Sequence, residues 1–128
     1  MSYYIDKTTD LAFDEAIAKV TAALKDEGFG VLTDIDVQAT LKKKLDVDFR
    51  PYRILGACNP QYAYQALQAE SMVGTMLPCN VIVQATEGGS LVAAIDPIAS
   101  MQAIDNPQLG EIAEVIREKL RRVVESVG

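Results

Sequence analysis

The sequence predicts a single α+β domain over residues 1–128, with its elements in the order β-α-β-α-β-α-β-β-α. Three observations support this fold class. The chain has 128 residues, of which 49% are hydrophobic and 23% are charged, as expected for one globular domain. Apolar residues recur at helical spacing in some segments, and short segments rich in Val and Ile lie between them. No linker, repeat or low-complexity tract divides the chain.

A strand and a long helix are predicted at the start of the chain. Residues 3–6 form a short strand, and Thr9 or Asp10 offers an N-cap for the helix that follows. The apolar stripe of this helix comprises Phe13, Ile17, Val20 and Leu24. These positions are three or four residues apart, so we expect the helix to pack on a sheet and to end at Gly28.

A second strand and a shorter helix are predicted next. Residues 31–35 form the strand, and Asp36 is the expected N-cap of the helix. The apolar side of this helix comprises Val37, Leu41 and Leu45. The lysines at positions 42–44 fit its last turn, where cations face the negative end of the helix dipole.

The middle of the chain predicts a third strand that leads directly into a helix. Residues 52–58 form the strand, and Gly56 allows another backbone or a ligand to come close to its end. Asn59 and Pro60 have the pattern of an N-cap and a first helical position. Cys58 is therefore expected directly before a helix start.

The last third of the chain predicts a β-hairpin and a long helix. Residues 80–85 and 91–95 are strands rich in Val and Ile, with a Gly-Gly turn between them. Residues 98–105 are expected to be irregular, and Asn106 with Pro107 marks the start of the final helix. Its long apolar stripe, which must be buried against the sheet, comprises Leu109, Ile112, Ile116, Leu120, Val123 and Val127.

The charge and hydropathy of the chain argue against several classes of partner. Its formal net charge is −6 and its pI is about 4.6, whereas nucleic-acid binding draws on Lys and Arg to neutralise phosphates. No apolar run approaches the roughly 20 residues that cross a bilayer. The first residues lack the basic start and the apolar stretch of a signal peptide. We therefore expect a cytoplasmic protein with neither a nucleic-acid nor a membrane partner.

The sequence contains no histidine, which removes the commonest general base and every Ser–His or Cys–His pair. The remaining catalytic candidates are Cys58 and Cys79. Backbone N–H groups at a helix start favour negative charge, so Cys58 can become a thiolate there. If the two strands that carry the cysteines are antiparallel neighbours, both thiols lie at the same end of the sheet. Whether the chain is an enzyme stays open, and no cofactor is indicated.

The same residues also have purely structural explanations. Free cysteine is often a small buried hydrophobe, and Asn59 and Asn80 are simply explained as caps of a helix and a turn. A reversible disulfide stays open, whereas a static one is disfavoured in the cytosol. No metal site is expected, since two thiolates supply half of a tetrahedral zinc shell. We expect three methionines either to fill gaps in the core or to form the floor of an adaptable apolar pocket: Met72, Met76 and Met101.

Two segments carry a resemblance to a known family: residues 52–60 (YRILGACNP) and residues 76–83 (MLPCNVIV). Together with the first helix and residues 28–37, they make almost the whole chain similar to the prokaryotic "domain of unknown function 302" family. The resemblance implies a curved, mainly antiparallel sheet with helices packed on one side, in an arrangement like that of the TATA-binding protein. It also implies a homodimer, and it implies no activity.

Three functional hypotheses follow. The first is a homodimeric module that binds a small ligand or a partner in a cleft. This cleft is bounded by Cys58, Asn59, Pro78, Cys79 and Asn80. The second hypothesis is thiol-based redox or nucleophilic chemistry at the two cysteines. The third is a purely structural interaction module, whose apolar loops at residues 72–77 or 98–104 form the dimer.

Overall fold

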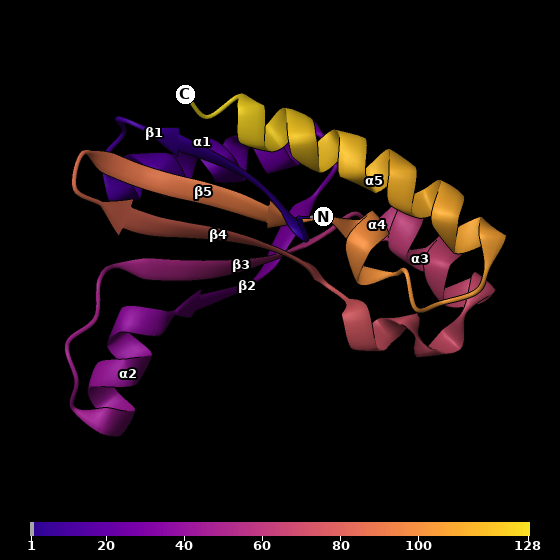
Figure 1. The fold of residues 1–128 in the computed structure, drawn as a ribbon, viewed down its shortest axis with the longest axis horizontal. Coiled ribbons are helices and arrows are strands. Elements are labelled where there is room, and N and C mark those ends of the chain that lie inside the picture. Colours follow the sequence, from indigo (N-terminus) through magenta and orange to yellow (C-terminus); the bar gives the residue numbers. More distant parts are fainter. Residues whose placement is uncertain (1) are drawn as a thin grey trace.

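A computed structural model describes residues 2–128, and Figure 1 shows its fold. Its elements are β1 (Tyr4–Thr9), α1 (Phe13–Asp26), β2 (Gly30–Asp36), α2 (Val37–Leu45), β3 (Tyr52–Cys58), α3 (Pro60–Ala69), the 3₁₀ helix η1 (Ser71–Met76), β4 (Cys79–Thr86), β5 (Gly89–Ile95), α4 (Pro97–Ser100) and α5 (Pro107–Glu125). The predicted order of strands and main helices is confirmed, with η1 and α4 added to it. Within this range no helix combines the length and the apolar composition that crossing a membrane requires.

The five strands form one sheet in the order β1-β5-β4-β3-β2, and every neighbouring pair is antiparallel. The first strand lies beside the last one, with Tyr4 opposite Ile95. β3 and β4 are also neighbours, with Ala57 opposite Cys79. The α+β class and its antiparallel sheet are confirmed, whereas the likeness to the TATA-binding protein stays a prediction.

α1 and α5 lie side by side across one face of the sheet (Figure 1). Their apolar stripes meet the central strands in one core. The largest fully buried side chains of this core are Val20, Leu24, Leu55, Val81, Val83, Val92, Leu120, Val123, Val124 and Val127. Each such burial stabilises the fold by about 1.5–3 kcal/mol relative to leaving the side chain in water. The prediction that both helices pack on a sheet is confirmed.

The opposite face of the sheet is left uncovered by these two helices. One row of cross-strand partners on this face comprises Asp6, Ala93, Ile82, Ile54 and Ile35. Most of this row is apolar, and the side chain at its end, Ile35, is 47% exposed. α2 lies away from α1 and α5, on the uncovered side in Figure 1, and has no buried residue.

Two predicted helix caps, Asp36 and Asn106, are formed, and Asp96 provides a third cap that the sequence did not predict. Asp36 accepts a hydrogen bond from the backbone N–H of Ala39 at 2.9 Å and so caps α2. Asn106 accepts from the N–H of Gln108 at 3.0 Å, and its side-chain amide donates to the backbone carbonyl of Ala69, the last residue of α3. Asp96 caps α4 by accepting from Ile98 at 3.0 Å, so the segment expected to be irregular begins as a short helix.

The start of α1 differs from the expected cap. Its N-cap position is Ala12, which makes no side-chain cap bond. The reason is that β1 continues through Thr9, which pairs with Ser90 of β5. The Thr9 hydroxyl instead accepts from the N–H of Leu11 at 3.2 Å, and so shapes the turn between strand and helix.

Two substitutions in the last helix test its start and its buried face. Asn106→Ala removes the cap and should lower the free energy of unfolding by about 0.5–2 kcal/mol. Leu120→Ala opens a cavity in the core and should lower it by about 2–5 kcal/mol. Urea unfolding followed by circular dichroism measures both. Asn106→Ser keeps a cap oxygen and should lose less than the alanine variant, whereas equal losses for the two alanine variants would contradict the full burial of Leu120.

Candidate functional site

The end of β3 and the start of β4 bring both cysteine segments to one place. Because the two strands are antiparallel neighbours, the exit of one and the entry of the other lie at the same end of the sheet. One cavity is lined by Cys58, Asn59, Pro78 and Cys79, four of the five predicted cleft residues. Its volume is about 30 Å³.

The remaining walls of the cavity are apolar and come mainly from helices. They include Phe29, Tyr62, Ala66, Leu77, Met101 and Ile116. Tyr62 and Ala66 come from α3, Ile116 comes from α5, and Phe29 precedes β2. No Asp, Glu, Lys or Arg lines the cavity. The cavity therefore suits an uncharged or soft guest better than a hard ion.

Gly56 is required where β3 approaches its neighbours. A Cβ atom at this position would clash with the hydroxyl of Thr33 and would lie 2.8 Å from Cγ of Pro78. Any side chain there would push Pro78 away from the sheet, and Pro78 forms part of the cavity wall. The expected close approach at Gly56 is thus made by a neighbouring strand and by Pro78 itself.

Asn59 occupies the N-cap position of α3, but its side chain makes no cap hydrogen bond. Its side-chain amide instead donates to the backbone carbonyl of Glu27 at 3.4 Å. The turn at Gly28, with φ of 87°, brings that carbonyl near, and a Cβ on Gly28 would lie 3.2 Å from Nδ2 of Asn59. The expectation of a plain side-chain cap is wrong, because Asn59 joins the start of α3 to the turn between α1 and β2.

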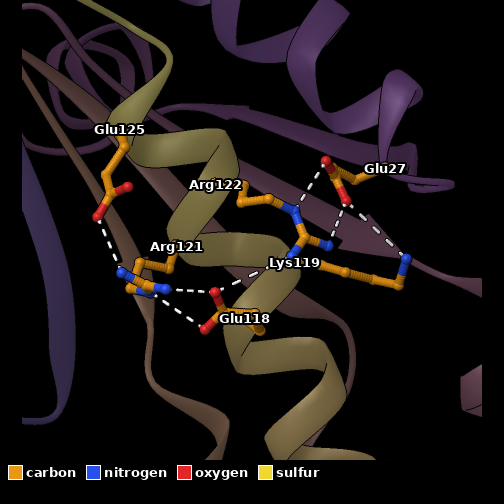
Figure 2. Close-up of polar contacts among 6 residues, drawn as sticks. All are labelled: Glu27, Glu118, Lys119, Arg121, Arg122 and Glu125. Carbon is orange, nitrogen blue, oxygen red and sulfur yellow. Dashed lines mark hydrogen bonds and ion pairs between the residues drawn. The ribbon is translucent and has the colours of Figure 1, made fainter.

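The same Glu27 anchors this turn to α5 through its carboxylate, as Figure 2 shows. The carboxylate accepts from Nη2 of Arg122 at 2.9 Å and from Nε at 3.2 Å, and Lys119 lies 3.9 Å away. The hydrogen bond from Arg122 holds the pKa of Glu27 below its ordinary value. On α5 itself, Arg121 pairs with Glu118 and with Glu125. Such exposed ion pairs contribute little to stability, because water and salt screen them.

Asn80 does not line the cavity, which differs from the predicted cleft. Successive side chains of a strand point to opposite faces, and Cys79 points toward the helices. Asn80 is exposed on the uncovered face of the sheet, where it lines a shallow open hollow with Tyr4, Tyr52 and Gln84.

Neither cysteine forms a disulfide in the described structure, and both thiols are partly buried. Burial, and then the neighbouring Cys58, raise the pKa of Cys79 to about 11. Cys79 is therefore a neutral thiol at physiological pH, and this argues against a nucleophilic thiolate at that position. Among residues 2–128, no group of three or more His, Cys, Asp or Glu side chains could hold a metal ion.

Some lining residues were predicted only in part from the sequence. Met101 lines the cavity as expected for one of the methionines, whereas Met72 is 68% exposed. Of the two tyrosines of α3, Tyr62 lines the cavity and Tyr64 is 65% exposed. Phe29 was not identified as a site residue, because nothing in the sequence relates the turn before β2 to the cysteine segments.

Comparisons with known proteins agree with the fold over the whole chain. The family model described as "Domain of unknown function DUF302" matches residues 5–127. The crystal structure of an uncharacterized conserved DUF302 protein from Bacillus stearothermophilus is similar, with 30% sequence identity, 100% of each chain covered and a TM-score of 0.93. No curated protein matches the chain. The similarity includes both segments that line the cavity.

The raised pKa of Cys79 predicts how its alkylation depends on pH. In a Cys58→Ser variant, the rate of iodoacetamide labelling at Cys79 should rise with pH with its midpoint close to 11, because the thiolate is the reactive form. The Cys58→Ser change removes only the smaller of the two causes that raise the pKa of Cys79. Burial, the larger cause, stays and keeps most of the pKa shift. Mass spectrometry of the labelled peptide measures the rate. Labelling of the unfolded variant should instead have its midpoint near 9.0, and equal midpoints in the two states would contradict the burial of this thiol.

Proposed function

The chain belongs to the DUF302 family, and we propose that it is a homodimeric binding module whose small ligand occupies the cavity at Cys58, Asn59, Pro78 and Cys79. One observation carries the ligand proposal. Two segments that are distant in the sequence converge on a single cavity with apolar walls, two thiols and no charged side chain. Ligand sites in proteins have this character, with mostly apolar walls and few polar groups.

The size of the cavity limits the ligand. Pockets for drug-sized molecules measure about 300–1,000 Å³, whereas this cavity measures about 30 Å³. It takes an ion or a group of a few heavy atoms without rearrangement. A larger guest has to displace a flexible wall residue, for which Leu77 and Met101 are the candidates.

Thiol chemistry is less well supported by the geometry than ligand binding. A nucleophile or an attacking redox thiol needs a thiolate, and the pKa of Cys79 at about 11 keeps that thiol protonated. The loops expected to form a purely structural interface are also partly used within the chain. Val73, Met101 and Ile104 belong to or pack against a second buried cluster around Leu109.

The uncovered face of the sheet supports pairing with a second copy. By the alternation of side chains along a strand, the apolar residues on this face are Tyr4, Ile35, Tyr52, Ile54, Ile82 and Leu91. A face of an antiparallel sheet that stays in water normally alternates to polar residues, and large apolar patches mark interaction sites. The chain carries a net charge of −6, so two copies meet most easily through a mostly uncharged surface such as this one, in which Asp6 is the one charged member of the row described above.

Xenon uptake tests the cavity. Xenon prefers apolar cavities, so pressurised gas should shift the amide NMR signals of residues around Cys79, Tyr62 and Ile116. Ala113→Leu fills the cavity and should abolish these shifts, at a cost of about 1–3 kcal/mol in stability. Ala18→Leu, on the exposed side of α1, is the control and should leave them unchanged. Identical shifts in the Ala113 variant would place the bound gas elsewhere and contradict the ligand proposal.

Sedimentation velocity tests the dimer. Ile82→Lys places a charge at the centre of the uncovered face and should convert a dimer to a monomer with an unchanged circular dichroism spectrum. Ala18→Lys adds the same charge on the helix layer and should remain a dimer. A wild-type chain that sediments as a monomer, or an Ile82 variant that stays dimeric, would overturn this part of the proposal.

A further inference from the structure

Three sulfur-containing residues line the same small cavity. Cys58 ends β3, Cys79 begins β4, and Met101 directly follows α4. We propose that these side chains form a binding site for a soft monovalent cation of the Cu(I) class, with two thiolate ligands and one thioether ligand. The inference rests on the proposed function, because it assigns a ligand class to the same cavity.

The donor set selects this class of ion. Thiolates and thioethers are soft ligands that favour Cu(I), whereas Mg²⁺, Ca²⁺ and Mn²⁺ take carboxylate, carbonyl and water oxygens. No carboxylate lines the cavity, and the chain contains no histidine. Zinc needs four ligands in a structural site, of which the cavity offers two thiols. Soft d¹⁰ ions are satisfied with two or three sulfur ligands, so no partner chain has to complete the shell.

The size of the cavity agrees with a single ion. Its volume of about 30 Å³ leaves room for one metal ion but not for a typical organic ligand. The surrounding apolar side chains, among them Phe29, Leu77 and Ile116, keep water and oxidants away from the sulfurs. Such a shell controls solvent access to a bound metal.

The proton and charge balance of binding is simple. The two S–H bonds of Cys58 and Cys79 break, two protons leave to solvent and two Cu–S bonds form, while copper stays Cu(I) and no sulfur is oxidised. The bis-thiolate complex carries one net negative charge. The N-terminus of α3 directly follows Cys58, and the side chain of Asn59 does not cap it. Its positive dipole end therefore offsets that charge.

Competition with a chromophoric Cu(I) chelator, bicinchoninate, tests the proposal under anaerobic conditions. The wild-type chain should take up one Cu(I) per chain. Cys58→Ser and Cys79→Ser should each weaken binding by more than about 100-fold. Mutating a residue that only hydrogen-bonds to a metal ligand already lowers metal affinity by about 10–100-fold, and losing the ligand itself should cost more. Met101→Leu should weaken it by about tenfold. Met72→Leu is the matched control, because Met72 is 68% exposed and lies outside the cavity, and it should bind as the wild type does.

Two further readouts separate the possible failures. Circular dichroism of the metal-free variants verifies folding, and Cys79→Ala replaces the serine variant if that one does not fold. X-ray absorption of the copper complex should show sulfur neighbours only. Cu(I) affinity that is equal in the wild type and the cysteine variants would overturn the site, as would oxygen ligation. Xenon uptake without Cu(I) binding would overturn this inference and leave the proposed ligand cavity standing.

Discussion

The antiparallel pairing of β3 with β4 is the constraint on which the rest of the structure depends. Ala57 lies opposite Cys79 in this register, which fixes both cysteines at one end of the sheet. A shift by one residue would turn Cys79 to the uncovered face and would move Val81 and Val83 out of the core. The hydrophobic burial that stabilises the fold therefore also selects the register that assembles the cavity.

The helix layer supplies the other half of the cavity for the same reason. α5 buries its stripe against the sheet, and Ile112, Ala113 and Ile116 reach the cavity as part of that stripe. α3 packs against α5 and η1, and its Tyr62 also reaches the main core. The cavity lies where the two helices and the sheet meet, and its apolar character follows from residues selected for packing.

The sequence predicted the elements well because their signals are local. The stripe from Leu109 to Val127, the Asp36 and Asn106 caps and the strand before Cys58 depend on residues within one or two turns. The sequence also predicted that the two cysteine segments converge, on the assumption that the strands that carry them are antiparallel neighbours. Sequence analysis failed where partners are distant: Asn59 bonds a carbonyl at Glu27, and β1 extends through Thr9 because of Ser90. Asn80 was misplaced since strand alternation was not applied next to Cys79.

The hydrogen bond from Asn59 to Glu27 joins one wall of the cavity to the turn before β2. Its length of 3.4 Å is near the limit for such bonds, whereas the carboxylate of Glu27 is held by Arg122 at 2.9 Å. The cavity wall at the first turn of α3 is therefore linked to α5 through Glu27, across the turn between α1 and β2. A cavity residue thus depends on an ion pair that lies outside the cavity.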